Sequence, residues 1–255
     1  MRGTPFLWLL TLLFTQTLAA EVLCPPDRID EQARVSRVVD GDTVWLTDRR
    51  KLRLIAMDTP EMGRKGRAAE PLAIRAKDYL HQLLAAQKYR ISLRYDLELK
   101  DRYKRTLVHS YLSDGNSITA LLLSQGLASL LIVPPNTWNF ECYQRVEQRA
   151  RKQRKGIWAL PAFQPRSVHT LTPEDGGLRI VQGRVRSVVK SRKNIWLNIG
   201  DDFGVRIPLN KQQYFTRYDL LSFKGKRLEV RGWLVQRKGR WQMTISHPVA
   251  LTVLH

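Results

Sequence analysis

The stretch that decides the fold runs from Val39-Asp40-Gly41-Asp42-Thr43-Val44 to Asp58-Thr59-Pro60-Glu61. Around it, residues 33–56 alternate between apolar and polar side chains and are interrupted by turn residues, which predicts antiparallel strands. Apolar residues then recur at helical spacing over 70–87, which predicts a helix. Two carboxylates therefore open one strand, and a third follows one hairpin later.

The segments that follow complete a small mixed domain. Strand patterns return at 89–95 and 106–112, and helices are predicted over 117–125 and 139–155. Five strands and three helices in this order predict an α+β, mainly β, domain built on a small closed barrel.

Asp42 and Asp58 indicate a metal site. Pro60 favours extended backbone at Thr59, which leaves the Thr59 carbonyl oxygen free to act as a third ligand. An all-oxygen set of this kind suits a hard divalent cation, Ca²⁺ before Zn²⁺.

Three further residues complete a set suited to phosphodiester hydrolysis. Glu61 lies close enough to Asp58 to hold the attacking water, and Arg53 and Arg105 can stabilise the charge that grows on the phosphate oxygens. Each motif also has a plainer interpretation: Asp-Gly-Asp as a turn, Asp-Thr-Pro-Glu as a loop or helix cap, and the arginines as solvated strand faces.

Taken together and in order, these motifs closely resemble the staphylococcal-nuclease-like, or thermonuclease, family over residues 33–160. The matching segments are 39–44, 53–61, Asp101-Arg102-Tyr103-Lys104-Arg105, Ser124-Gln125-Gly126-Leu127-Ala128 and Gly156-Ile157-Trp158. The resemblance implies an OB-type five-stranded barrel with three helices. It also implies an enzyme that cleaves DNA, with RNA left open as a substrate, and leaves 3′-phosphate ends.

The resemblance assigns roles to the same residues. Asp42, Asp58 and the Thr59 carbonyl would bind Ca²⁺, Glu61 would be the general base, and Arg53 and Arg105 would hold the phosphate. The sequence departs from the family pattern in two places. The loop at 62–67 is short, and 132–135 is Ile-Val-Pro-Pro where the best-known member carries nucleotide-contacting aromatic residues.

The charge of the chain indicates a polyanionic partner. The sequence has 43 Lys and Arg against 23 Asp and Glu, a net charge of +20, which fits nucleic acid or an anionic membrane surface. Residues 166–177 are predicted to be a linker between a nuclease-like domain at 21–165 and a basic, β-rich domain at 178–255. Short strands separated by turns predict a second OB-like barrel there.

Basic residues beside aromatic ones predict that the second domain binds nucleic acid. The candidate residues are Lys190, Arg192, Lys193, Trp196, Trp233, Arg237, Lys238, Arg240 and Trp241. The alternative is that the three tryptophans are core residues and that the charges only keep the domain soluble.

The N-terminus predicts export. Residues 1–20 have a basic start, an apolar run too short to span a membrane, and small residues at a cleavage site, which predicts a signal peptide. The mature chain is then expected to be periplasmic or secreted, monomeric, and not stably inserted in a membrane. In an oxidising compartment Cys24 and Cys142 are expected to pair, although two unlinked cysteines remain the alternative.

The sequence thus predicts an exported, calcium-dependent nuclease with a basic accessory barrel. The alternative is a nucleic-acid-binding or uptake protein on a nuclease fold that has lost turnover. The intact set of three carboxylates and two arginines argues against that alternative.

Overall fold

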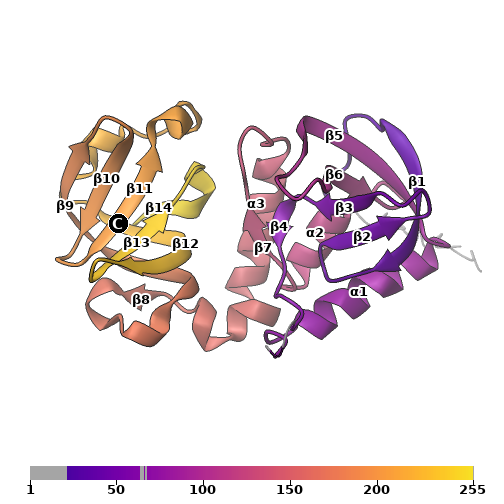
Figure 1. The fold of residues 1–255 in the computed structure, drawn as a ribbon, viewed down its shortest axis with the longest axis horizontal. Helices are drawn as coiled ribbons and strands as arrows, with labels where there is room; N and C mark the ends of the chain where they lie inside the picture. The colour runs from indigo at the N-terminus through magenta and orange to yellow at the C-terminus, as the bar shows by residue number, and fades with distance from the viewer. Residues whose placement is uncertain (1–21, 64–65, 67, 255) are drawn as a thin grey trace, which may run out of the picture.

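The computed structural model describes residues 22–63, 66 and 68–254 as two β-barrels packed side by side (Figure 1). The predicted signal peptide at 1–20 lies outside the described residues. Among the described residues, no helix is long and apolar enough to cross a membrane.

The first barrel closes through five strands in the order β1-β2-β3-β6-β5, with β5 pairing back onto β1. Neighbouring strands are antiparallel except for β3 and β6, which run parallel. The strands are β1 (Glu31–Val38), β2 (Thr43–Leu46), β3 (Lys51–Leu54), β5 (Arg90–Lys100) and β6 (Thr106–Tyr111). This is the barrel of OB type that the sequence predicts, and the fold prediction is confirmed.

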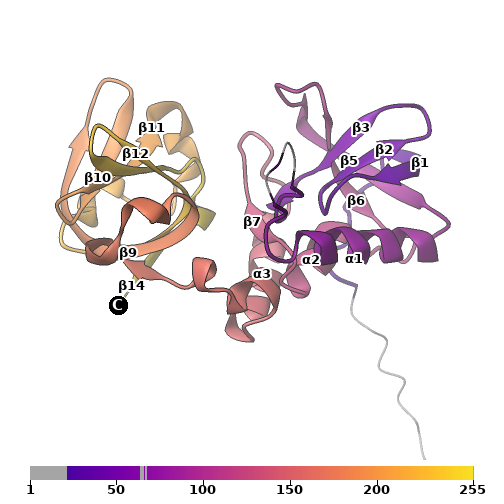
Figure 2. The ribbon, with the colours of Figure 1, turned by 60° about the horizontal axis from the view of Figure 1, so that its bottom comes forward.

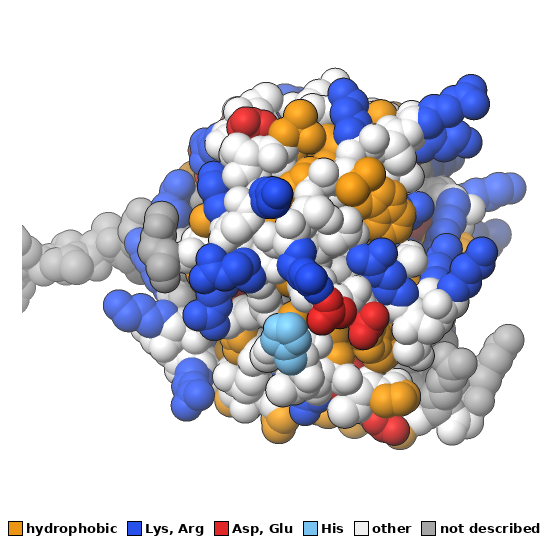
Figure 3. All heavy atoms as spheres, turned by 90° about the vertical axis from the view of Figure 1, so that its left-hand side faces the viewer, with side chains coloured by type: hydrophobic (Ala, Val, Ile, Leu, Met, Phe, Trp, Pro, Cys, Tyr) orange, Lys and Arg blue, Asp and Glu red, His pale blue; other side chains and the backbone are white. Residues whose placement is uncertain are grey.

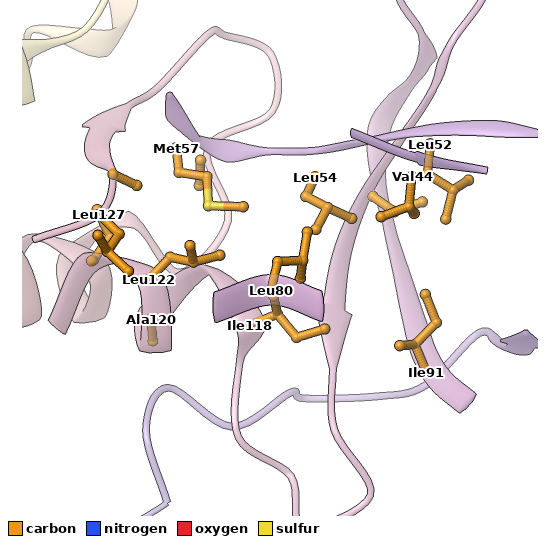
Figure 4. Packing of buried hydrophobic residues seen from close by; sticks show 14 of the residues in the cluster. Val44, Leu52, Leu54, Met57, Leu80, Ile91, Ile118, Ala120, Leu122 and Leu127 are labelled. Atoms are coloured by element: carbon orange, nitrogen blue, oxygen red, sulfur yellow. The ribbon is translucent and has the colours of Figure 1, made fainter. Parts of the chain in front are cut away.

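Three α-helices among the described residues pack against this barrel: α1 (Ala73–Ala86), α2 (Ile118–Ser124) and α3 (Phe140–Lys152). Helix α1 buries Ala73, Ala76, Leu80 and Leu84, which recur every three or four residues and so share one face. Figure 4 shows Leu80 lying between Leu54 of β3 and Ile118 of α2. The helix begins later than the predicted 70–87, and Ile74, expected on the apolar face, is 59% exposed.

A separate pair of short strands carries Asp58. β4 (Ala56–Asp58) pairs antiparallel with β7 (Ser129–Leu131), and Asp58 lies opposite Ser129. The alternation at 33–56 does not reveal this pair, because three residues are too few to show a period. The pair matters because it places an acid of the predicted site at the edge of the first barrel.

Two family motifs meet at Gly126 and Gly156. Both glycines have positive φ, and a Cβ on either would lie 2.1 Å from a backbone oxygen of the other segment. The amide of Ile157 donates to the Gly126 carbonyl oxygen at 2.8 Å. Any larger residue at either position would separate the segments, so the motifs are constrained by packing.

The second barrel repeats the topology of the first. Its strands follow the order β9-β10-β11-β13-β12, β12 pairs back onto β9, and β11 and β13 run parallel. The strands are β9 (Gly177–Lys190), β10 (Asn194–Ile199), β11 (Phe203–Pro208), β12 (Arg227–Arg237) and β13 (Arg240–Thr244), with β14 (Leu251–Leu254) added beside β12. The predicted second barrel is therefore confirmed.

Residues 166–177, predicted as a linker, contain the short strand β8 (Arg166–Ser167), which pairs with β9. Asp175 accepts hydrogen bonds from the Arg166 side chain and from the Thr172 amide, which close this segment on itself, while β8 attaches it to the second barrel. The domain boundaries at 165 and 178 remain predictions.

The two barrels share an interface formed by α3 and the outer face of β12. Both views place α3 on the side of the first barrel that faces the second (Figures 1 and 2). Trp158 and Ile180 belong to one small apolar cluster that crosses the boundary. Arg151 pairs with Glu229 at 2.6 Å, and Arg231 pairs with Glu147 at 2.7 Å.

A disulfide joins Cys24 to Cys142, and the prediction that these cysteines pair is confirmed. It ties the N-terminal segment to α3 across 118 residues of sequence. Closing a loop of that length lowers the conformational entropy of the unfolded chain. In the chain-entropy model this stabilises the folded state by about 4–5 kcal/mol.

Candidate active site

Asp42, Arg53 and Thr59 meet at the edge of the first barrel. Asp42 lies in the turn before β2, is buried, and forms an ion pair with the Arg53 guanidinium. Its Oδ2 also accepts hydrogen bonds from the Thr59 amide at 3.2 Å and the Thr59 hydroxyl at 3.0 Å. The two distant motifs of the sequence are therefore in direct contact.

Asp58 joins the same group through Arg53. The Nη2 of Arg53 lies 3.0 Å from Asp58 Oδ1, so one guanidinium connects both acids. Burial raises the pKa of Asp58 to about 6, because a charged carboxylate is poorly solvated there, and repulsion from Asp42 and Glu61 adds to the effect. Burial likewise raises the pKa of Asp40 to about 6, with repulsion from Asp42 as the next cause.

Arg105 lies in a tight turn that Asp101 closes. The Asp101 carboxylate accepts hydrogen bonds from the Arg105 Nε at 2.7 Å and from the Tyr103 amide at 2.9 Å. Arg53 and Arg105 line one cavity of about 470 Å³. Leu131, Val133 and the exposed Tyr103 also line it, and Val133 belongs to the 132–135 segment that departs from the family pattern.

Glu61 is exposed and lies on the other side of β4. Together with Asp58 it lines a different cavity, of about 770 Å³. Its amide donates to Glu70 Oε2 at 2.9 Å, and the Glu70 amide donates to the Glu61 carbonyl oxygen at 3.0 Å. These two bonds fix the backbone of Glu61 and leave its carboxylate at the cleft.

Asp42 and Asp58 supply carboxylate oxygens on either side of the Arg53 guanidinium. Among the described residues, no group of three His, Cys, Asp or Glu side chains is arranged closely enough to hold a metal ion. The Arg53 guanidinium supplies the positive charge between these acids, because it forms ion pairs with both Asp42 and Asp58. Burial is the main cause of the raised pKa values of Asp40 and Asp58, and carboxylate oxygens are ligands that Ca²⁺ prefers.

The predicted binding residues of the second barrel lie on the outer β10–β11 face with its two flanking turns, in the barrel core, and at the cavity with Asp58 and Glu61. The basic turns with Lys190, Arg192 and Lys193 and with Arg237 and Lys238 are exposed, and they lie at opposite ends of the β10–β11 face. Trp196 lies on that face over Gly204, near Arg240, whose Nη2 donates to Asn198 at 2.8 Å. Figure 3 shows Lys and Arg side chains spread over this side of the molecule.

The other two tryptophans lie elsewhere. Trp241 is 7% exposed and packs in the core of the second barrel, so for this residue the core alternative holds. Trp233 is 60% exposed and lines the cavity that contains Asp58 and Glu61. Sequence reasoning missed Glu70, Glu147 and Arg179 as neighbours of the site, and no motif marks them, because only the packing of distant segments brings them there.

Known proteins resemble the first barrel. A family model described as staphylococcal nuclease homologue matches residues 51–160. The thermonuclease of Staphylococcus hyicus is 34% identical over 133 residues, which cover 51% of this chain and 77% of that protein. The thermonuclease of Staphylococcus intermedius is 33% identical over 131 residues, covering 50% and 76%. An uncharacterized endonuclease of Escherichia coli O157:H7 is 29% identical over 147 residues, covering 54% and 81%.

The OB-type barrel, the Asp42–Arg53–Asp58 group and these relatives together define a nuclease, a hydrolase that acts on nucleic acid. The chain belongs to the staphylococcal nuclease family. The second barrel lies beyond the residues that the family model matches.

Proposed function

We propose that this protein is an exported, calcium-dependent nuclease that hydrolyses phosphodiester bonds of DNA and leaves 3′-phosphate ends. The observation that carries the proposal is the single guanidinium of Arg53, which connects Asp42 and Asp58 and lines a cavity with Arg105. The relatives named thermonuclease and endonuclease support the same class of reaction.

Each residue has a role in this proposal. Asp42, Asp58 and the Thr59 carbonyl oxygen would hold Ca²⁺, which when bound supplies positive charge beside the scissile phosphate. Glu61 accepts the proton of the attacking water. Arg53 and Arg105 bind the phosphate oxygens through paired N–H groups, and these bonds strengthen as negative charge develops.

The direct test is digestion of plasmid DNA by the mature chain with Ca²⁺, with Mg²⁺ or with excess chelator. Cleavage is expected with Ca²⁺ and is expected to disappear with chelator, because the proposal assigns the metal the positive charge that stabilises the phosphate beside the carboxylates. Restored cleavage after added Ca²⁺ confirms that chelation did not unfold the protein. Undiminished cleavage in chelator would contradict the metal assignment.

Arg105 allows a cleaner test of phosphate binding than Arg53, since its partner Asp101 lies in a surface turn. In Arg105→Lys the charge remains but the two-pronged donor is lost, so kcat is expected to fall about 10²–10³-fold, with a smaller rise in KM. Arg102→Lys is the matched control, because Arg102 lines the same cavity and lies over the same Tyr103 ring. Equal kcat values in the two variants would leave Arg105 without a role in the transition state.

Export is part of the proposal and rests on two observations. Residues 1–20 have the pattern of a signal peptide, and Cys24 forms a disulfide with Cys142. Disulfides persist in oxidising compartments, which supports a location in the periplasm or outside the cell.

The outer face of the second barrel is proposed to bind nucleic acid. Its two basic turns lie at the two ends of six-residue strands, about 20 Å apart, with Trp196 and Arg240 between them. Phosphates would contact the turns and a base would stack on Trp196. This is the arrangement by which OB barrels bind oligonucleotides.

A further inference from the structure

The cavity that holds Asp58 and Glu61 has walls from both barrels. The first barrel contributes Asp58, Glu61 and Ser129, and the second contributes Arg179 and Trp233. Its volume of about 770 Å³ is within the range that encloses a molecule the size of one or two nucleotides, and it is too small for a duplex. The second barrel therefore forms one wall of the cavity that contains Asp58 and Glu61.

The position of Trp233 follows from the alternation of β12. Leu228, Val230 and Leu234 point into the second barrel and are buried, so the residues between them point outward. Of the outward residues, Glu229 and Arg231 form ion pairs with the first barrel. Trp233 is the next outward-pointing residue of this row, and its side chain is 60% exposed.

The backbone at Trp233 is held by pairing of β12 with β9. Trp233 pairs with Leu178 of β9, and Gly232 pairs with Arg179, so the arginine lies on the strand beside the tryptophan. The Arg231–Glu147 ion pair, two residues away, has side chains only 10% and 7% exposed. The exposed Trp233 ring and the Arg179 side chain thus line one cavity with Asp58 and Glu61.

From this arrangement we propose a nucleotide subsite in which Trp233 stacks on a base beside the scissile phosphate and Arg179 binds a neighbouring phosphate. The proposal rests on the function proposed above and specifies its substrate: a single strand, or a locally unpaired one. Base stacking on an aromatic ring tolerates any sequence because every base has a flat face, so the subsite selects for strandedness.

Binding is measured first, on the full mature chain in chelator, with a fluorescently labelled single-stranded oligonucleotide and no cleavage. Trp233→Ala is expected to weaken binding about tenfold or more, while Trp233→Phe keeps most of the affinity. Leu221→Ala is the control, because it removes an apolar side chain that is 56% exposed from the same barrel, outside the cleft. Arg179→Gln is expected to reduce the slope of log affinity against log salt by about 0.7, the value for one phosphate contact on a single strand.

Cleavage is then measured with Ca²⁺ on matched single-stranded and duplex DNA. Trp233→Ala is expected to lower kcat/KM on the single strand by the factor seen in binding, and to change duplex cleavage much less. Cleavage by the wild type with no effect of Trp233→Ala in either assay would overturn the subsite and leave the nuclease function intact. Binding that depends on Trp233 without any cleavage would overturn the proposed function and keep the subsite.

Discussion

Replacing Glu61 with Gln is expected to lower kcat by about 10²–10⁴-fold, the usual effect of removing a general base. The glutamine has nearly the same shape but cannot accept the proton of the attacking water at neutral pH. Glu61 is exposed, and its backbone bonds to Glu70 do not involve its carboxylate. Stability is therefore expected to stay within about 0.5 kcal/mol of the wild type.

Glu70→Gln is the matched control for that experiment. Glu70 lines the same cleft and carries the same charge, and a glutamine there keeps an oxygen that accepts the Glu61 amide hydrogen. Any loss of activity that comes only from removing negative charge should appear in both variants. Single-turnover cleavage with saturating Ca²⁺ is the measurement, and equal losses in Glu61→Gln and Glu70→Gln would contradict the base assignment.

Replacing Arg231 with Met is expected to lower the free energy of unfolding by about 3–5 kcal/mol, because it leaves the Glu147 carboxylate buried without its cation. Arg231 donates to Glu147 at 2.7 Å and to the Leu130 carbonyl oxygen at 3.0 Å. Glu147 also accepts the Leu130 amide hydrogen at 2.5 Å. One ion pair therefore connects α3, β7 and the second barrel, and β7 pairs with the strand that carries Asp58.

An exposed ion pair at the same interface provides the control. Arg217 pairs with Glu141, but these side chains are 72% and 51% exposed, so Arg217→Met is expected to cost about 0–1 kcal/mol. The double variant Arg231→Met with Glu147→Gln should recover most of the lost stability, since a neutral amide still accepts the Leu130 amide hydrogen. Urea unfolding of all four proteins is the measurement. A loss below about 1 kcal/mol in Arg231→Met would show that the buried pair does not hold the barrels together.

This interface changes what truncation of the second barrel would measure. A chain that ends near residue 170 would lose Arg231 and leave Glu147 buried and unpaired beside the strand of Asp58. It would also expose Trp158, which packs with Ile180 and lies under the Arg151 and Arg231 guanidinium groups. Removing the barrel would thus disturb the catalytic strand, so point variants such as Trp233→Ala separate binding from chemistry more cleanly.

The sequence by itself predicted both barrels and named Asp42, Asp58 and Arg53 as members of one site, while their ion pairs emerged from the structure. This was possible because strand alternation, glycine turns and the Asp-Gly-Asp and Asp-Thr-Pro-Glu motifs are local patterns. Such patterns depend on residues a few positions apart, which the order of the chain already fixes. The pairing of Cys24 with Cys142 was also predictable, since the chain contains only two cysteines.

Only the tertiary structure decided where the tryptophans and the arginines of the second barrel lie. Trp233 and Trp241 follow basic or glycine residues in similar local sequence, yet one lines the catalytic cleft and the other is buried in the core. The difference comes from which face of β12 or β13 meets the first barrel, and that depends on contacts between residues about 80 or more positions apart, such as Glu147 and Arg231. Local periodicity shows that a strand has two faces, but only the packing of the whole chain determines what each face meets.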